Sequence, residues 1–175
     1  MNDTLPTVYL SFLLVLLLIA AIFVFQQIIK TRRTESRFSR LQKQLKDEKG
    51  TAQEYYELGS IYLDKKLFVQ AVKLFQQALK TKKTEPENKA LINNALGYAY
   101  FAQEQYDIAI RQYKEALKLY PEYVVAWNNL GNAYERKQLV TQALEAYEKA
   151  LEYEPDNDTA KRRAQSLRKR FAPSN

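Results

Sequence analysis

The chain has 175 residues, of which 46% are hydrophobic, and it contains only four Gly and five Pro. This composition indicates one modest, mainly helical domain with an appendage, and since Cys and His are both absent, it excludes disulfides, Cys/His zinc sites and imidazole bases. The formal charge of +7 is uneven, because residues 30–50 carry eight basic and three acidic side chains and residues 161–175 carry six basic ones.

The first predicted element is a run without charge from Thr4 to Ile29, whose most apolar part is Val8 to Phe25. A helix over Val8 to Phe25 would span about 27 Å, close to the hydrocarbon thickness of a bilayer. Apolar residues lie on every face, which excludes an ordinary amphipathic surface helix. The run predicts a transmembrane anchor over residues 8–29, after a short N-terminus of residues 1–7.

A cleavable signal peptide would need basic residues before its apolar core and small residues at a cut site after it. Here the order is reversed, since Asp3 precedes the run and basic side chains follow it. We therefore expect an uncleaved anchor, and the positive-inside rule then puts the N-terminus outside and the rest of the chain on the cytoplasmic or stromal side. The membrane-flanking basic residues are Lys30, Arg32, Arg33, Arg37 and Arg40.

Residues 30–51 connect the anchor to the rest of the chain. Phe38, Leu41 and Leu45 follow the spacing i, i+3 and i+7, which predicts a helical stalk that stops at Gly50. Its basic face would either contact anionic lipid head groups or remain a solvated charged surface. Lipid is favoured over nucleic acid, because the body that follows has no basic face.

Three later segments resemble one another: ELGSIYLDKKLFVQAVKLFQQAL at 57–79, ALGYAYFAQEQYDIAIRQYKEAL at 95–117 and NLGNAYERKQLVTQALEAYEKAL at 129–151. Their glycines at 59, 97 and 131 are 38 and 34 residues apart, and the shorter interval is the tetratricopeptide period. We place repeat one at 52–89, repeat two at 90–123 and repeat three at 124–157. The four extra residues of the longer interval are expected in the connection TKKTEPEN at 81–88.

The chain thus resembles the tetratricopeptide repeat family, position by position. Small residues recur where two helices would cross, aromatic residues fill the space between them, and Pro121 and Pro155 end second helices. The departures are Asn93 at an aromatic position and Pro86, displaced by three places. The small residues are Gly59, Gly97, Gly131, Ala71, Ala109, Ala143, Ala78, Ala116 and Ala150.

A polar terminal helix is expected to cap the stack. Residues 158–171, DTAKRRAQSLRKRF, fit such a cap, with Asp158 or Thr159 as the N-cap, and residues 172–175 form a tail. The predicted fold class is all-α, with an N-terminal transmembrane helix followed by an α-solenoid of three tetratricopeptide repeats and a C-terminal capping helix.

The resemblance implies a protein-binding scaffold rather than an enzyme, and no cofactor is expected. It places the binding surface on the concave face, which is lined by the first helix of each repeat. Asparagine amides there could pair with the backbone of an extended peptide, or could solvate the groove or bond to neighbouring helices. The candidate groove residues are Tyr56, Ser60, Leu63, Leu91, Asn94, Tyr98, Phe101, Asn128, Asn129 and Asn132.

One partner class is disfavoured. Family members that bind the acidic C-terminal tails of chaperones use a clamp of Lys, Asn and Arg, and the matching positions here hold Tyr56, Ser60, Ala95, Val125 and Asn129. Without the cations, terminal carboxylates have nothing to pair with.

The whole chain is similar to a small family of cyanobacterial and algal-plastid proteins, through LPTVYL at 5–10, TRR at 31–33 and EYYELGSIYLDKKLF at 54–68. This resemblance implies a thylakoid membrane protein with its repeats in the stroma or cytoplasm. It would bind photosystem I subunits or assembly intermediates and assist the assembly or accumulation of photosystem I. The alternative is a membrane-tethered receptor or adaptor in protein translocation or envelope biogenesis. A remoter one is a nucleic-acid or ribosome tether that uses the basic residues of 161–170.

Overall fold

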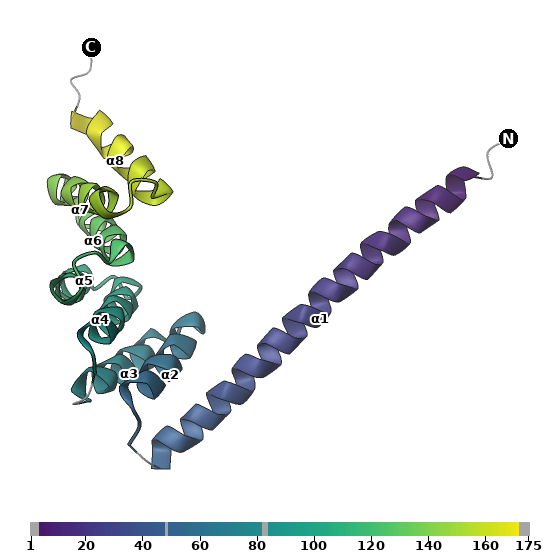
Figure 1. Ribbon diagram of the computed structural model, residues 1–175, viewed down its shortest axis with the longest axis horizontal. Coiled ribbons are helices and arrows are strands. Elements are labelled where there is room, and N and C mark those ends of the chain that lie inside the picture. Colours follow the sequence, from purple (N-terminus) through teal and green to yellow (C-terminus); the bar gives the residue numbers. More distant parts are fainter. Residues whose placement is uncertain (1–3, 48, 82–83, 172–175) are drawn as a thin grey trace. The chain divides into compact units, whose positions relative to one another are not determined.

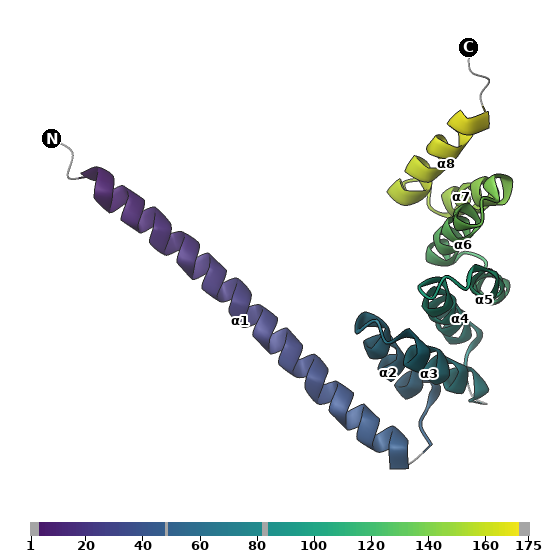
Figure 2. The same ribbon diagram turned by 180° about the vertical axis from the view of Figure 1, so that it is seen from behind.

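The computed structural model describes residues 4–47, 49–81 and 84–171, and these ranges hold eight α-helices and no strand (Figures 1 and 2). The all-α prediction is confirmed. The helices are α1 (Thr4–Asp47), α2 (Ala52–Asp64), α3 (Phe68–Lys80), α4 (Pro86–Phe101), α5 (Tyr106–Leu119), α6 (Val124–Arg136), α7 (Val140–Tyr153) and α8 (Asp158–Phe171).

Helix α1 is one unbroken helix of 44 residues, so the apolar run and the basic stalk are continuous. At 1.5 Å per residue it is about 66 Å long. Among the described helices, α1 alone is long and apolar enough to cross a membrane, over Val8–Lys46. It ends at Asp47, so the predicted stop at Gly50 is displaced, and Gly50 instead donates its N–H to the Tyr55 hydroxyl (3.2 Å).

The chain divides into two compact units, residues 1–46 and 47–175. In the second unit α2 pairs with α3, α4 with α5, and α6 with α7, and each pair packs on the next through contacts of α3 with α4, α5 with α6 and α7 with α8. Figure 1 shows these helices as a stack that runs from α2 to α8. Among the first helices, α4 also contacts both α2 and α6, and we call the face that α2, α4 and α6 form the inner face.

Each helix pair closes around a glycine that faces an aromatic ring. An added Cβ at the glycine would lie only 2.7 to 2.8 Å from the nearest ring carbon, closer than atoms pack in a protein interior. The rings themselves are fully or almost fully buried. The facing residues are Gly59 and Phe75, Gly97 and Tyr113, and Gly131 and Tyr147.

The six alanines predicted at the helix crossings are completely buried. Ala71, Ala109 and Ala143 lie in the first half of the second helices, and Ala78, Ala116 and Ala150 lie one to two turns later. Side chains of this size let the helices approach closely. The predicted pattern of small and aromatic residues is therefore the packing pattern of the solenoid.

The four extra residues of the first interval form an added helical turn rather than a longer loop. Helix α4 begins with Pro86 at its first turn, four residues before Ala90, the position that matches Val124 at the start of α6. Because an α-helix has about 3.6 residues per turn, four more residues extend α4 without rotating its later side chains far. Pro86 thus begins α4 and does not end α3, whose last turn is closed by Thr81 (Oγ1 to the Ala78 carbonyl, 2.6 Å).

The turn inside each helix pair contains a non-glycine residue in the left-handed region. Lys66, Glu104 and Gln138 have φ of 59°, 59° and 62°. The residue after each one donates its N–H back across the helix end, as in the bond from Leu139 to the Tyr134 carbonyl (2.9 Å). This bond belongs to the Schellman motif, in which the left-handed position usually holds Gly.

Helix α8 caps the stack, but its N-cap differs from the prediction. The Asn157 Oδ1 accepts the N–H of Ala160 (2.9 Å), so Asn157 is the N-cap, and Asp158 and Thr159 lie inside the first turn. Ala160, Ala164 and Leu167 are buried at i, i+4 and i+7, which is the pattern of one apolar stripe packed on α7. Two of its cations pair with the stack: Arg163 with Glu135 (3.7 Å) and Arg168 with Glu148 (2.7 Å).

We expect Gly97→Ala to lower the free energy of unfolding by about 1–2 kcal/mol, because overlap with the buried Tyr113 ring outweighs the better helix propensity of Ala. Urea denaturation of the full chain in detergent, followed by circular dichroism, measures the change. The same substitution made together with Tyr113→Ala should lose most of its cost. An unchanged or raised stability of the single variant would contradict the close crossing.

Gln138→Gly should raise the free energy of unfolding by about 1 kcal/mol, since Gly adopts a positive φ without steric strain. The measurement is the same denaturation curve. Gln138→Ala is the matched control, because it keeps a Cβ at the left-handed position and should give no such gain. Equal stabilisation by both variants would rule out relief of backbone strain as the cause.

Candidate protein-binding groove on the inner face

The predicted groove residues lie on α2, α4 and α6, the three helices of the inner face. Their side chains fall into two groups in the structure. One group is polar and bonded within the protein, and the other is apolar and exposed.

Three of the four candidate asparagines are bonded to neighbouring elements. Asn129 on α6 donates to the Asn94 Oδ1 on α4 (2.9 Å), and Asn94 donates in turn to the Tyr123 hydroxyl (3.2 Å). Asn128 donates to the Asn157 Oδ1 (3.1 Å). Of the two expected roles, these contacts favour bonds from the amides to neighbouring helices over bonds to the backbone of a bound peptide.

The asparagine bonds repeat with the period of the fold. Asn94 and Asn128 are equivalent residues 34 positions apart, and so are their partners Tyr123 and Asn157. The first bond joins α4 to the residue that precedes α6, and the second joins α6 to the residue that precedes the capping helix α8. Sequence reasoning missed Tyr123 and Asn157, although the repeated spacing of 29 residues between donor and acceptor is visible in the chain.

Tyr123 is held as a neutral phenol. Burial raises its pKa above the usual value and nearby Tyr56 raises it further, while the bond from Asn94 works in the opposite direction. Its ring also stacks on Tyr120 at 5.7 Å between centroids. Tyr123 is therefore a structural anchor for Asn94 rather than an ionisable group of the groove.

The exposed apolar side chains of the inner face are Leu91 (36% exposed), Tyr98 (46%) and Val125 (52%). Leu91 and Tyr98 are seven residues apart on α4 and so lie on the same side of that helix, and Val125 is the residue of α6 that matches Leu91. We call these three residues the apolar strip. From the sequence alone, Val125 is only one of the positions where chaperone-binding family members carry their cationic clamp, and not a candidate groove residue.

The remaining candidates border the strip without extending it. Tyr56, Leu63 and Phe101 are half-buried, as is Asn132. The Ser60 hydroxyl donates to the backbone carbonyl of Tyr56 in its own helix (2.9 Å), so its proton is already engaged in a hydrogen bond. Phe101 packs edge-on against the Tyr106 ring at 5.3 Å.

A small cavity of about 180 Å³ marks the first end of the inner face, between the starts of α2 and α4. Tyr56 and Leu91 line it together with Gln53, Glu85 and Asn88. Two predicted groove residues from different repeats thus share one hollow. Its volume is below that of typical sites for small ligands, which fits one side chain of a bound segment.

The two buried crossing tyrosines differ in their hydroxyl contacts. Burial raises the pKa of both, and Tyr147 also donates to the Glu135 Oε1 (2.7 Å), which raises its pKa further. In the second repeat the position of Glu135 holds Phe101, and the Tyr113 hydroxyl has no hydrogen-bond partner among the described residues.

Among the described residues no group of three metal-ligating side chains is found.

Comparisons with known proteins agree with the repeat fold. A family model described as a tetratricopeptide repeat matches residues 50–122, and a second one with the same description matches residues 94–158. The chain is 39% identical over 163 residues to the protein ycf37 of Cyanophora paradoxa, covering 93% of this chain and 95% of that one.

A second relative is the tetratricopeptide repeat domain-containing protein PYG7, chloroplastic, of Arabidopsis thaliana. It is 37% identical over 162 residues, which cover 93% of this chain but 54% of PYG7, so the chain spans about half the length of that relative. Among solved structures, the first repeat domain of Spaghetti (RPAP3) bound to the HSP90 peptide SRMEEVD has a TM-score of 0.64 and 22% identity, covering 71% of this chain and 95% of that one. At this identity the likeness shows the fold alone.

The tetratricopeptide repeats define a non-catalytic protein-interaction scaffold. The chain belongs to the tetratricopeptide repeat family, in the plastid and cyanobacterial branch that contains ycf37 and PYG7.

We expect Asn94→Ala to lower the free energy of unfolding by about 1–3 kcal/mol, because it leaves the part-buried Asn129 amide and Tyr123 hydroxyl without their partner. Thermal and urea denaturation of the full chain measure the loss. Asn132→Ala is the control, since that half-buried amide makes no hydrogen bond to another described residue, and it should change stability by less than about 0.5 kcal/mol. Equal costs for both variants would show that the bonded network adds nothing.

Proposed function

We propose that the chain is a membrane-anchored scaffold that holds subunits or assembly intermediates of photosystem I at the thylakoid surface. The observation that carries the binding part of this proposal is the apolar strip of Leu91, Tyr98 and Val125 on the inner face. Exposed apolar side chains that gather on one face mark interaction sites more often than scattered ones do.

The structure of the strip suggests how a partner would bind. Its residues project from two neighbouring helices beside a hydrogen-bonded asparagine network. Asn94, Asn128 and Asn129 already donate to protein partners, so a partner gains affinity mainly by burying its own apolar side chains on the strip rather than by replacing those bonds. The buried Asn128 Oδ1, which has no hydrogen-bond partner among the described residues, is a candidate acceptor for an N–H of the partner. The missing cationic clamp argues against an acidic chain terminus as the bound segment in this groove.

Helix α1 supports the membrane part of the proposal. The large apolar side chains from Val8 to Ile29 are all exposed in the structure, and water is a poor solvent for a helix that is apolar on every side. A bilayer of about 30 Å hydrocarbon thickness covers a segment of that length. We propose residues 8–29 as the anchor, with the N-terminus on the lumenal side.

The basic residues that follow the apolar segment support the orientation. Lys30, Arg32, Arg33, Arg37 and Arg40 lie in the next three turns of the same helix, and they are exposed. Basic flanks remain on the cytoplasmic or stromal side of a membrane. The repeats would then face the stroma of a plastid or the cytoplasm of a cyanobacterium.

The choice of photosystem I as the partner rests on the resemblance to the anchored cyanobacterial and algal-plastid repeat proteins. The relatives ycf37 and PYG7 support a plastid or cyanobacterial setting. A scaffold anchored beside the thylakoid surface can engage newly inserted subunits where they are made available, because tethering raises the local concentration of both partners.

Deletion of the chain should lower photosystem I relative to photosystem II, and complementation tests the groove. Val125→Asp should fail to restore photosystem I, because it places a charge on the apolar strip. Val69→Asp should restore it, since Val69 has nearly the same exposure (55% against 52%) but lies on α3, outside the inner face. The measurements are the P700 content per chlorophyll and the low-temperature fluorescence ratio of the two photosystems.

Two outcomes would overturn the proposal. Unchanged photosystem I in the deletion strain, including under strong light or low temperature, would remove photosystem I as the client. Equal rescue by both variants, at equal amounts in the membrane fraction, would remove the strip as the binding surface. Defects in translocation or envelope proteins instead would favour the membrane-tethered receptor or adaptor.

A further inference from the structure

A second surface lies on the opposite side of α6 from the inner face. It is a cleft of about 580 Å³ bordered by α5, α6 and α7. Its α6 residues Trp127, Leu130 and Tyr134 lie about 140° to 200° around the helix from Val125 of the apolar strip. The cleft is thus separate from the groove of the proposed function.

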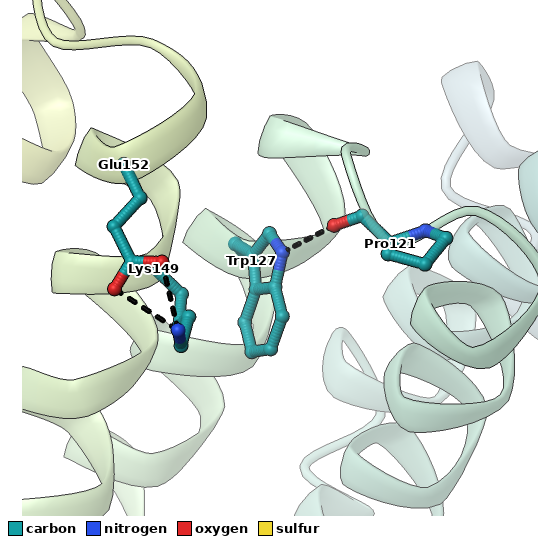
Figure 3. Close-up of polar contacts among 4 residues, drawn as sticks. All are labelled: Pro121, Trp127, Lys149 and Glu152. Atoms are coloured by element: carbon teal, nitrogen blue, oxygen red, sulfur yellow. Dashed lines mark hydrogen bonds and ion pairs between the residues drawn. The ribbon is translucent and has the colours of Figure 1, made fainter.

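The floor of the cleft is apolar and well packed. Leu117, Leu130, Tyr134 and Ala146 are buried beneath it. Trp127 forms a wall, and its Nε1–H donates to the Pro121 carbonyl (2.8 Å). Figure 3 shows that this bond turns the indole nitrogen toward Pro121 and leaves the ring beside Lys149 of α7. Because its one polar atom is satisfied, the indole offers only apolar ring surface to a ligand.

The preceding repeat junction shows why the cleft exists here. There, Gln112 takes the place of Ala146 and the buried Asn93 takes the place of Trp127. Gln76, at the position of Lys114, donates to the Tyr100 hydroxyl (3.0 Å). The equivalent surface of the first junction therefore has the longer Gln112 at its floor position and a Gln76 side chain tied to Tyr100, whereas the second junction combines a small floor residue with an aromatic wall.

The rim of the cleft is positively charged. Three lysines and one glutamate line it, namely Lys114, Lys118, Lys149 and Glu145. Lys114 lies over the Tyr134 ring (5.7 Å to its centroid). Within the described part of the chain, Lys118 and Lys149 pair only with Glu115 and Glu152 of their own helices, at 2.6 and 2.7 Å, and all four of these side chains are exposed. Such exposed pairs contribute little, so both ammonium groups can exchange their partner for a ligand carboxylate.

We propose that this cleft binds an acidic protein segment that inserts one bulky apolar side chain between flanking carboxylates. The volume is within the range of ligand pockets and admits a Leu or Phe side chain. When such a side chain is inserted, the carboxylates on either side of it in the bound segment would approach the lysines of the rim. An apolar anchor in a pocket gives most of the affinity, and charge complementarity gives selection of the acidic segment.

The single tryptophan of the chain makes the test direct, because Trp127 is a wall of the cleft. The probe is the blocked peptide Glu-Glu-Leu-Phe-Glu-Glu, added to the full chain in neutral detergent. We expect a saturable blue shift of the tryptophan emission, since the ligand removes water from the indole, and weaker binding as salt is added. Peptides with Lys in place of Glu, or with Ser-Gly in place of Leu-Phe, should bind about tenfold more weakly or not at all.

Two variants test the site against a matched control. Ala146→Gln introduces the side chain that the preceding repeat carries at the same position, and it should abolish the response while the thermal melt shows a folded chain. Lys114→Glu with Lys149→Glu should weaken binding about tenfold or more. Lys80→Glu, the equivalent of Lys118 at the first junction, should leave binding unchanged.

Three results would overturn the proposal: no saturable response to the acidic peptide, equal affinity for the basic peptide, or full binding by a folded Ala146→Gln variant. Emission that depends on the concentration of the chain alone would also overturn it, since a second copy would then occupy the cleft. The Val125→Asp variant, which disrupts the apolar strip, should still bind the acidic peptide, so the two surfaces are tested separately.

Discussion

The solenoid depends on the contact between a helical glycine and an aromatic ring in each repeat. At Gly97 an added methyl group would lie 2.7 Å from the Tyr113 ring, and the ring cannot retreat because it is completely buried. This contact sets how closely the two helices of a pair approach, and the packing of α3 on α4 and of α5 on α6 then fixes the spacing at which α2, α4 and α6 meet on the inner face. The inner face and the cleft beside α6 are both consequences of that spacing.

The asparagine network is a second constraint that follows from the first. Once α4 and α6 lie this close, polar groups between them lose water and need partners. Asn129, Asn94 and Tyr123 satisfy one another in a chain of two bonds, at 2.9 and 3.2 Å. These three residues of the inner face are thus committed to holding the repeats together, which leaves apolar surface as the main means of recognising a partner.

Much of this could be predicted from the sequence because the repeat supplies three copies of each local rule. The glycine, alanine and aromatic positions could be predicted since each depends only on spacing along two helices. The N-cap at Asn157 could not, because Asn157, Asp158 and Thr159 are all good caps and the choice depends on where α8 docks on α7. The extra turn of α4 was also missed, since Pro86 suits the start of a helix as well as its end. The candidate groove residues were chosen by position alone, and position does not reveal that Asn94 and Asn128 already have partners.

Helix α6 has a special place because it contributes to both surfaces. Val125 belongs to the apolar strip and Trp127 to the cleft, so one helix connects the two without sharing a side chain between them. The strip is uncharged, whereas the rim of the cleft carries three lysines and one glutamate. Their chemistry therefore selects different segments, and a partner with both kinds of segment, or two partners, could occupy them together. Once one segment of a partner is bound, its second segment binds at a high effective concentration. Two weak contacts would therefore hold a partner more firmly than either contact alone, while each contact remains readily reversible.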